Sequence, residues 1–397
     1  METYHIRKQI HRLPGKVIHT VPLPQPEIVE GHGARRKIGK ICQKCGYNNV
    51  LIVTDQTLSA LGYEQAITEA LDEAQIHYAI FNDINSEPTI ELIEAGRKKA
   101  IECQAECLIA LGGGSVMDTT KMIAAGAKMP RQSIKSLLLK FLPVPGKTLP
   151  MISVPSTAGT GAEVTVCAVV HNSQGVKTST VLVGLDVTHV ILDSELTIHA
   201  PQGVTAACGM DAFSHVVEGA VSDVKVDEAN MYLSKEGVRL IFENLPIVIR
   251  EPENIEARLN MCRAAYFGGH AINTQLAGYI HAFAHSIGAK YHLPHGQAIS
   301  LMLMPVLKFQ KEVCKEKYAM LARHCHLAHL DTEDVQAAEL FLQAVAQLMA
   351  QCGMDKLVSP VKAEDYAELI RMVAQDSINY SAPITLNNDD IEQILKS

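Results

Sequence analysis

Strand-like and helix-like segments alternate along the first half of the chain, and this alternation constrains the fold more than any other feature. Apolar runs with strand character cover residues 49–54, 76–81, 107–112 and 149–155. Segments with helical patterns lie between them, near residues 63–74, 90–104 and 115–127. Continuous apolar strands separated by helices are typical of a parallel sheet with helices on both faces. The alternation therefore predicts an α/β domain, and ligands of such sheets bind at the carboxyl ends of the strands.

The periodicity changes after about Pro201. Segments such as "NIEARLNMCRAAYFGGHAI" and "VQAAELFLQAVAQLMAQCG" have apolar residues at helical spacing and few β-branched runs. A chain of 397 residues is also too long for one ordinary core, since a domain typically holds about 100 to 200 residues. The sequence has no internal repeat or low-complexity linker, so the change of period alone predicts the boundary. We expect an α/β domain over residues 1–200 and an all-helical domain over residues 201–397.

Charge and cysteine content narrow the classes of partner and compartment. A net charge of −8 gives no general attraction to nucleic acid or to an anionic membrane, which favours small-molecule ligands. The ten cysteines are mostly scattered, and Cys42 and Cys45 have no second CxxC pair to complete a four-thiolate zinc site. The N-terminus lacks the apolar segment of a signal peptide, and the sequence contains no long uninterrupted apolar run. We therefore expect a cytoplasmic protein without nucleic-acid or membrane partners.

A glycine-rich stretch, "ALGGGSVMDTTK" at residues 110–121, follows a predicted strand and opens a predicted helix. Glycines let the backbone approach a pyrophosphate, and the free N–H groups at a helix start supply donors and a positive dipole end. The spacing is not that of the GxGxxG fingerprint, and such turns also serve packing alone. The context nevertheless favours a nucleotide phosphate site.

Two further features point to the same ligand. Asp55 ends an earlier strand, where an acidic residue can accept hydrogen bonds from a ribose 2′-hydroxyl and would repel a 2′-phosphate. A second polar turn, "SVPSTAGTGAEVT" at residues 153–165, offers hydroxyl groups beside glycines and suits phosphate or ribose. Read alone, that turn is equally an ordinary Ser/Thr/Gly loop.

Histidines and one aspartate form a candidate metal site in the second half. Asp211 and His215 are four residues apart on a predicted helix, so both side chains project from one face. His281 and His285 repeat that spacing, and His295 lies in a following loop that could fold back toward them. One carboxylate and several imidazoles suit a divalent transition metal, and iron(II), zinc, cobalt and nickel all fit.

A competing histidine cluster, "HCHLAH", lies further along the chain and contains His324, His326 and His329. His326 and His329 could share a helical face, but no nearby carboxylate completes a ligand set. We interpret this cluster as a helix surface or a packed helix face.

Four stretches together resemble the signatures of a known family. They are "GGGSVMDTTK", "PSTAGTGAEVT", "GMDAFSH" and "HAFAHSIGAKYHLPHG", and their order and spacing are similar to those of the iron-containing (group III) alcohol dehydrogenases. The resemblance covers roughly residues 26–310. It implies an N-terminal Rossmann-like parallel-sheet domain and an all-α C-terminal domain, the dehydroquinate synthase-like arrangement, with a metal and the nicotinamide in the cleft between them.

Matching these motifs position by position implies the site residues. The metal ligands of the family fall on Asp211, His215, His281 and His295. His285 takes the place of an additional histidine that is implicated in proton movement. The cofactor-binding positions of the family, which hold the ribose, cradle the pyrophosphate or line the cofactor cleft, fall on Asp55, Gly112, Gly113, Gly114, Ser115, Asp118, Thr157, Thr160 and Lys177.

The resemblance also implies the reaction: a metal-dependent oxidoreductase that transfers a hydride between a nicotinamide cofactor and a primary or small secondary alcohol or aldehyde. Asp55 favours NAD over NADP because a carboxylate repels a 2′-phosphate. Iron(II) is the expected metal, with zinc, nickel and cobalt as alternatives. Oligomers are common in the family, and a homodimer is the default symmetric expectation.

Two other functions remain open from the sequence. The same architecture resembles glycerol dehydrogenases and dehydroquinate synthases, so an NAD- and metal-using lyase is an alternative. Such a lyase would need Lys or Arg side chains near the metal for its phosphorylated substrate, and residues 205–300 offer few beside the candidate ligands. A non-catalytic metal-binding protein would not need the glycine loop, Asp55 and the metal residues together.

Overall fold

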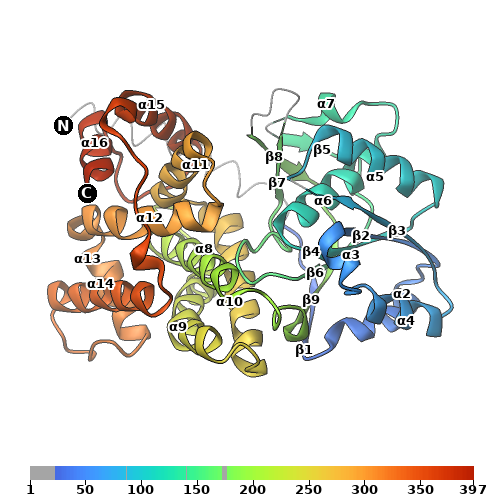
Figure 1. The fold of residues 1–397 in the computed structure, drawn as a ribbon, viewed down its shortest axis with the longest axis horizontal. Helices are drawn as coiled ribbons and strands as arrows, with labels where there is room; N and C mark the ends of the chain where they lie inside the picture. The colour runs from blue at the N-terminus through green and yellow to red at the C-terminus, as the bar shows by residue number, and fades with distance from the viewer. Residues whose placement is uncertain (1–22, 86, 140, 172–176) are drawn as a thin grey trace. The chain divides into compact units, whose positions relative to one another are not determined.

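The computed structural model describes residues 23–85, 87–139, 141–171 and 177–397. The chain forms two compact units (Figure 1). One consists of Val21–Thr157 and Gly161–His199, and the other of Ala158–Thr160 and Ala200–Ser397. The first is called the α/β unit below, and the second the helical unit.

The α/β unit is built on a six-stranded sheet. Its strands are β1 (Glu27–Gly31), β2 (Asn49–Asp55), β3 (His77–Ile84), β4 (Cys107–Gly112), β6 (Met151–Pro155) and β9 (Val187–Asp193). They lie in the order β1-β9-β6-β4-β2-β3, and every neighbouring pair is parallel. The predicted parallel sheet is therefore confirmed. The sequence reading missed β1 and β9, because β1 is short with an exposed pattern and β9 carries polar residues.

Helices cover both faces of this sheet (Figure 1). They are η1 (Ala34–Lys37), α2 (Ile38–Cys45), α3 (Gln56–Ala60), α4 (Gln65–Glu73), α5 (Ile90–Glu102), α6 (Gly114–Lys128) and η2 (Ser194–Leu196). Ile52 and Ile109 belong to a buried cluster with Ile38 of α2 and Leu71 of α4. On the other face α5 and α6 pack closely, since a Cβ on Gly96 would lie only 2.3 Å from Ile123. Burial on both faces explains why the central strands are continuously apolar.

A second, smaller sheet belongs to the same unit. It has the order β5-β8-β7, with β5 (Phe141–Pro143) parallel to β8 (Lys177–Val183) and β7 (Cys167–His171) antiparallel to β8. The short helix α7 (Ile134–Leu137) precedes β5. The sequence analysis did not predict this sheet, because β5 and β7 are short and β8 begins with four polar residues, so none of them forms a long apolar run.

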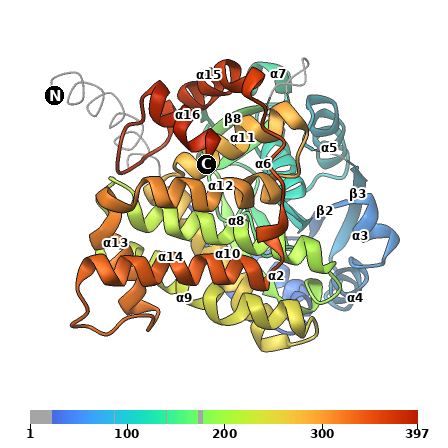
Figure 2. The ribbon, with the colours of Figure 1, turned by 60° about the vertical axis from the view of Figure 1, so that its left-hand side comes forward.

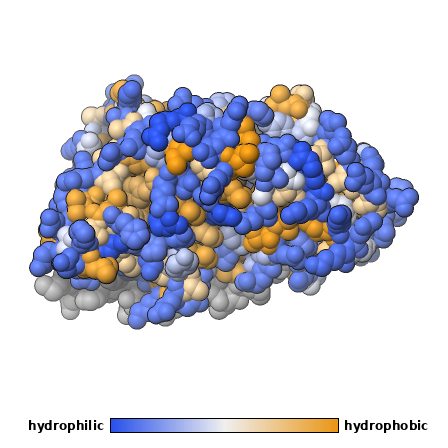
Figure 3. Space-filling view, turned by 90° about the horizontal axis from the view of Figure 1, so that it is seen from below, coloured by the Kyte–Doolittle hydropathy of each residue, from blue (hydrophilic) through white to orange (hydrophobic). Residues whose placement is uncertain are grey.

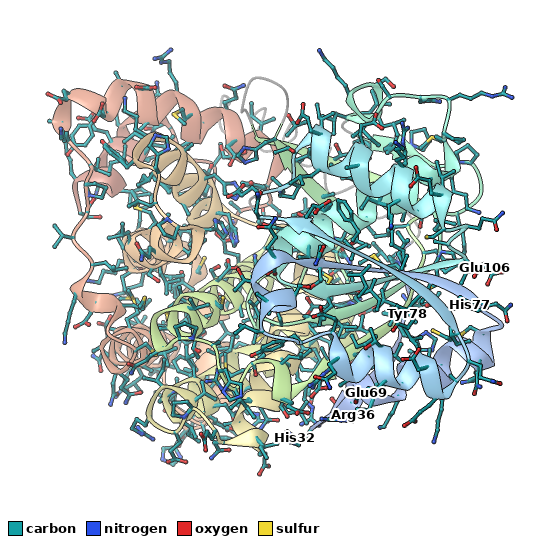
Figure 4. All side chains as sticks on the ribbon, turned by 45° about the vertical axis from the view of Figure 1, so that its right-hand side comes forward. His32, Arg36, Glu69, His77, Tyr78 and Glu106 are labelled. Carbon is teal, nitrogen blue, oxygen red and sulfur yellow. The ribbon has the colours of Figure 1, made fainter. Side chains whose placement is uncertain are left out.

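The two ends of the main sheet differ in chemistry. Figure 4 shows Glu106, His77 and Tyr78 together at the end where strands begin, and Glu106 accepts hydrogen bonds there from the N–H groups of Asn48 and Asn49. Asp55 and the glycine-rich loop lie where β2 and β4 end. Asp55 and the glycine-rich loop, which are predicted to bind the cofactor, are thus at the carboxyl end, where ligands of such sheets bind.

The helical unit contains no strand among its described residues. Its elements are α8 (Gln202–Val221), α9 (Glu228–Arg250), α10 (Ile255–Gln275), α11 (Tyr279–Tyr291), α12 (His295–Phe309), α13 (Lys311–His324), α14 (Asp334–Gln351), η3 (Met354–Lys356), η4 (Ala363–Asp365), α15 (Tyr366–Asp376), η5 (Ser377–Asn379) and α16 (Asn388–Lys396). The predicted all-helical second half is confirmed.

Helix α8 lies at the centre of this unit. It packs against α9, α10 and α12, and Figure 2 shows it in the middle of the group. Met210, Phe213, Val216 and Val217 are all fully buried, so the helix is enclosed on several sides. A helix with this surrounding burial has little solvent to hydrate polar side chains, and its polar residues therefore need a specific reason to be there.

No helix in the described part of the chain is long and apolar enough to span a bilayer. The face in Figure 3 carries hydrophobic residues in small groups between hydrophilic ones.

Candidate metal centre and cofactor-binding residues

Three helices of the helical unit supply the predicted metal ligands. Asp211 and His215 lie one turn apart on α8, His281 lies in the first turn of α11, and His295 is the first residue of α12. The start of α12 abuts α8, since a Cβ on Gly296 would lie 2.5 Å from the carbonyl oxygen of Ala207. A glycine after His295 therefore permits the close approach of these two helices.

The three imidazoles converge on one oxygen of the Asp211 carboxylate. Asp211 Oδ1 lies 3.7 Å from His215 Nε2, 3.8 Å from His281 Nε2 and 3.2 Å from His295 Nε2. The rings of His215 and His281 stack with centroids 4.5 Å apart. Donor atoms of Asp211, His281 and His295 all lie within 4.8 Å of one another. The structure thus brings together the carboxylate and three imidazoles that the sequence proposed.

Two atoms at this point lack partners. Asp211 Oδ1 and His281 Nε2 are buried and have no hydrogen-bond partner among the described residues. Leaving a buried polar group unpaired costs about 1 to 3 kcal/mol, and more when the group is charged. A divalent cation would satisfy both atoms at once, so the residues fit a metal of the kind that accepts nitrogen and oxygen ligands.

The protonation states of Asp211 and His215 also suit a metal. Burial alone would raise the pKa of Asp211, but the neighbouring imidazoles of His215 and His295 outweigh it and hold the pKa well below its usual value. Burial lowers the pKa of His215 to about 3, and the charge of Asp211 opposes this only in part. The carboxylate is therefore ionised and the imidazole neutral, which are the forms that bind metals.

Glu218 contacts His281 on the side of its ring away from Asp211, and the sequence analysis did not predict it. Its Oε2 lies 2.5 Å from His281 Nδ1, and its Oε1 accepts a hydrogen bond of 2.6 Å from the N–H of Ile280. Burial would lower the pKa of His281, but the charge of Glu218 outweighs it and raises that pKa to about 10. A Cβ on Gly278 would lie 2.8 Å from Glu218, so glycine leaves room for it. Its spacing of seven residues from Asp211, on the same helical face, was the available signal.

His285 lies next to these residues without joining them. Its ring centroid is 5.2 Å from that of His295 and 6.0 Å from that of His281. Its Nδ1 lies 3.0 Å from Asp376 Oδ2 and 2.9 Å from the hydroxyl of Tyr380. Neither Asp376 nor Tyr380 was predicted, since both are more than 90 residues away and carry no local motif.

The glycine loop of the α/β unit forms an open helix start. Helix α6 begins at Gly114 with Gly113 as its N-cap, and no side chain among the described residues caps it. Gly112 is needed for packing, because a Cβ there would lie 2.4 Å from Val116. Thr157 lies beside the loop, with its Oγ1 3.5 Å from the position of a Cβ on Gly113. Ser115 follows in the first turn, so N–H and hydroxyl donors gather where an anion could bind.

Asp55 and Asp118 have partners within the chain. Asp55 Oδ1 accepts a hydrogen bond of 2.8 Å from the N–H of Leu58 and so caps α3. Asp118 Oδ1 lies 2.9 Å from Lys121 Nζ, and its Oδ2 accepts from the N–H of Val169. Oδ1 thus pairs within α6, and Oδ2 ties α6 to β7, so both oxygens have partners within the chain.

Two other residues that the sequence predicts to bind the cofactor, Thr160 and Lys177, lie outside the glycine-rich loop. Thr160 belongs to the short segment Ala158–Thr160, which groups with the helical unit. Lys177 is the first residue of β8 and pairs with His171 through the backbone, but its side chain lies outside the described part of the structure.

Of the competing histidines, His324 lies on a helix as predicted, whereas His326 and His329 lie beyond its end and not on a helix. Helix α13 ends at His324, and His326 has a φ of 58°, a left-handed conformation that terminates the helix. His324 lies 3.3 Å from Glu236. Among the described residues, the one group of His, Cys, Asp or Glu side chains close enough to share a metal is that of Asp211.

Comparison with known protein families agrees with this arrangement. The family model described as "Iron-containing alcohol dehydrogenase" matches residues 24–194. The model described as "Fe-containing alcohol dehydrogenase family, C-terminal" matches residues 205–397. The chain belongs to the iron-containing alcohol dehydrogenase family. It is therefore an oxidoreductase of the alcohol dehydrogenase type, and the predicted family, fold and enzyme class are confirmed.

Individual relatives cover nearly the whole chain. The NAD-dependent methanol dehydrogenase of Bacillus methanolicus is 30% identical over 386 residues, which span 94% of this chain and 98% of that protein. Alcohol dehydrogenase 4 of Saccharomyces cerevisiae is 28% identical and covers 92% of this chain and 95% of that protein. The crystal structure of a 1,3-propanediol oxidoreductase superposes with a TM-score of 0.88 at 28% identity and covers 95% of this chain and 99% of that one.

Proposed function

We propose that this alcohol dehydrogenase uses NAD and one divalent metal to interconvert a primary or small secondary alcohol and the corresponding aldehyde or ketone. The observation that carries the proposal is the convergence of Asp211, His215, His281 and His295 at a point where a buried oxygen and a buried ring nitrogen have no other partner among the described residues. In a chain of this family, such a set is the natural place for the metal.

The four side chains would hold the metal, and Glu218 would orient one of them. A bound divalent cation supplies Lewis acidity, which lowers the pKa of an alcohol hydroxyl and polarises a carbonyl. Asp211 contributes the negative charge of the set, and the three imidazoles contribute nitrogen donors, of which His281, with its raised pKa, would lose a proton when the metal binds. Iron(II) is the metal that the family name indicates, while zinc, nickel and cobalt accept the same ligands.

The open start of α6 would hold the pyrophosphate of NAD. Gly112, Gly113, Gly114 and Ser115 supply a close backbone approach and unpaired N–H groups. Thr157 adds a hydroxyl beside the loop, and Thr160 and Lys177 remain expected cofactor residues from the motif match. Asp118 is proposed to act indirectly, by fixing α6 on β7 through Oδ2 and by holding Lys121 through Oδ1.

Asp55 would select NAD over NADP. One oxygen of its carboxylate caps α3. At the end of β2 this carboxylate would accept a hydrogen bond from a ribose hydroxyl, and its negative charge would repel a 2′-phosphate. The relative from Bacillus methanolicus is named NAD-dependent. His285 would exchange the proton of the alcohol with solvent, because its imidazole lies beside the ligand set without being part of it.

The partners follow from the same chemistry. We expect a small-molecule alcohol or aldehyde as the substrate, and neither nucleic acid nor membrane as a partner, since the net charge of −8 gives no general attraction to either. A homodimer and a cytoplasmic location remain predictions.

A direct assay tests this function. The protein would be purified anaerobically, reconstituted with iron(II) or zinc, and mixed with NADH and a panel of aldehydes while nicotinamide absorbance is followed. Metal- and aldehyde-dependent loss of NADH is expected. Absence of NADH oxidation with every aldehyde and metal would overturn the proposal, and conversion of a phosphorylated substrate without net NADH loss would favour a lyase instead.

A variant sharpens the cofactor assignment. Asp55→Asn keeps an N-cap for α3 because Asn caps helices as well as Asp does. It removes the charge, so the preference for NAD over NADP in kcat/KM is expected to fall about tenfold. An unchanged preference would remove Asp55 from the ribose site.

A further inference from the structure

We propose that Asp376 and Tyr380 are positioning residues for His285: together they fix the orientation of its imidazole and keep the proton of the neutral ring on Nδ1. The inference rests on the proposed function, since it assigns His285 a working orientation within that site. It concerns residues that no motif in the sequence marks and that lie far from the metal ligands along the chain.

The three side chains form a closed triangle of hydrogen-bond distances. His285 Nδ1 lies 3.0 Å from Asp376 Oδ2 and 2.9 Å from the Tyr380 hydroxyl, and that hydroxyl lies 3.2 Å from Asp376 Oδ2. Both contacts of the ring use the same nitrogen, Nδ1. Nε2, on the opposite side of the ring from Nδ1, is therefore directed away from the triangle. The ring centroids of His285 and His295 are 5.2 Å apart.

Counting hydrogens shows how the triangle selects a tautomer. Nδ1 of a neutral imidazole either donates one hydrogen or accepts one, but it cannot do both. The Asp376 carboxylate only accepts, so the Nδ1–H form gains a charge-assisted hydrogen bond. The Tyr380 hydroxyl can then donate to the same carboxylate. Asp376 thus favours the tautomer whose Nε2 carries a lone pair, the form able to take a proton from a substrate hydroxyl.

Tyr380 keeps the arrangement intact when the hydrogen shifts. If Nδ1 is bare, the Tyr380 hydroxyl can rotate and donate to it instead, over 2.9 Å. Each ring form therefore has a partner at Nδ1, and the imidazole need not rotate to find one. Because Tyr380 serves both forms while Asp376 selects one, the loss of Asp376 is expected to have the larger effect.

The segment that carries these two residues is held firmly against the helical unit. Asp376 is the last residue of α15, and α15 packs against α11, the helix that carries His285. Directly after Tyr380, the N–H of Ser381 donates to the carbonyl of Ala277 over 3.0 Å, and the Ser381 hydroxyl lies 2.9 Å from that of Ser222. The positioning groups are thus fixed to the region where α11 begins.

The exposure of the pair argues against a purely structural role. The side chains of His285 and Asp376 are 39% and 33% exposed. Pairs that reach solvent contribute little to stability, about 0 to 1 kcal/mol. We therefore expect variants at Asp376 and Tyr380 to fold, so that changes in turnover can be attributed to the ring of His285.

The test compares Asp376→Asn and Tyr380→Phe with a matched control. Lys290→Met is the control, since Lys290 also joins α11 to α15, through Glu368, and to Asp365 at 3.0 Å, but it does not touch His285. If the first two variants acted only by loosening the packing of these helices, Lys290→Met would show the same change.

Two readouts decide the outcome. With metal and NAD bound, Asp376→Asn is expected to lower kcat about 10- to 100-fold with unchanged KM for NAD and unchanged metal content, and Tyr380→Phe to lower it severalfold. In the metal-free protein, 15N NMR of the His285 ring is expected to show a shift from the Nδ1–H toward the Nε2–H tautomer in Asp376→Asn, because an amide can donate to Nδ1.

Each result has one meaning. Wild-type kcat and ring signals in Asp376→Asn, or an equal loss of kcat in Lys290→Met, would overturn the inference. If the wild-type protein oxidises no alcohol at all, the proposed function fails, while the NMR comparison still decides whether Asp376 sets the tautomer. If Asp376→Asn does not fold, Asp376→Ala, which also removes the carboxylate acceptor at Nδ1, provides the same two readouts.

Discussion

Two regions of this molecule bury charged groups in opposite ways. In the α/β unit, Lys121 is fully buried, and its ammonium lies 2.9 Å from Asp118 Oδ1, 3.0 Å from Thr165 Oγ1 and 2.8 Å from the carbonyl of Cys167. Three acceptors meet three donors, and the region is complete without any ligand. In the helical unit, Asp211 is as deeply buried, but its Oδ1 has only imidazole nitrogens nearby and no hydrogen bond among the described residues.

The difference separates a structural cluster from a binding site. Burying a charge is costly unless it is paired and hydrogen-bonded, so both regions must compensate. The region of Lys121 compensates from within the chain. The region of Asp211 is left incomplete, and a cation would complete it.

Glu163, whose carboxyl is influenced by the charge of Lys121, shows a third outcome. It is buried, its Oε1 has no hydrogen-bond partner among the described residues, and burial raises its pKa to about 7. It therefore compensates by keeping a proton. Asp211 does not, because the imidazoles around it hold its pKa low.

The largest effect is expected from Asp211→Asn, which removes the charge at the incomplete region. The metal should be lost on dialysis, and kcat/KM should fall about a thousandfold or more, equivalent to roughly 4 kcal/mol. The metal-free variant should be less stable than the metal-free wild type at neutral pH, because the lowered pKa of Asp211 means that its charge, beside the imidazoles, stabilises the folded chain. Metal analysis, kinetics and thermal unfolding check these points, and full retention of metal would contradict the comparison.

Lys121→Met should have the opposite character. It leaves Asp118 and two further acceptors without their donor, which is expected to cost about 3 kcal/mol or more in the free energy of unfolding. Metal content per folded molecule should stay unchanged, since Lys121 belongs to the other unit. Urea unfolding with metal analysis of the folded fraction provides the check. A stable variant that has lost its metal would reverse the roles of the two regions.

Glu163→Gln tests compensation by a proton. Because the pKa of the folded state is raised from 4.5 to about 7, the wild type loses stability as the pH rises from about 4.5 to 7. Gln cannot ionise, so the variant should gain on the wild type over this range, by on the order of 2 to 3 kcal/mol at pH 8 and by nothing at pH 4.

Unfolding of both proteins at several pH values measures this difference. Glu106→Gln is a control of opposite sign, because backbone hydrogen bonds from Asn48 and Asn49 lower the pKa of the exposed Glu106 carboxyl. The stability of Glu106→Gln relative to the wild type should fall, not rise, as the pH increases from the lowered pKa of Glu106 to its ordinary value of 4.5. A pH-independent difference for Glu163→Gln would mean that this carboxyl is paired in the folded protein.

The smallest effect is expected from Glu218→Gln, which changes the partner of a ligand but not a ligand. Groups that orient metal-bound histidines typically affect affinity 10- to 100-fold, and Gln keeps an acceptor for the N–H of Ile280. We therefore expect a loss of metal affinity near tenfold, measured by chelator competition. An unchanged affinity would show that the 2.5 Å contact with His281 serves packing only.

Much of the fold could be predicted from local patterns. The strands β2, β3, β4 and β6 and the helices α4, α5 and α6 lie where apolar runs and helical periods placed them, because their burial is set by local alternation. The small sheet and the edge strand β1 were missed. Their strands are short and half-exposed, so pairing across the chain, and not local pattern, determines them.

The site shows the same limit. Asp211, His215, His281 and His295 were found through helical spacing and motif, and the fold brings them together. Glu218 shared their helical face and could have been found by extending the same spacing. Asp376 and Tyr380 could not, because tertiary packing of α15 on α11 alone brings them to His285.

The most direct test of the account is anomalous diffraction at the iron edge from crystals of the iron-reconstituted protein. We predict a single strong peak per chain, within coordination distance of Asp211 Oδ1 and of the nearest ring nitrogens of His215, His281 and His295. A peak at any other place, or none at full reconstitution, would contradict the claim that the unpartnered atoms around Asp211 mark the metal site.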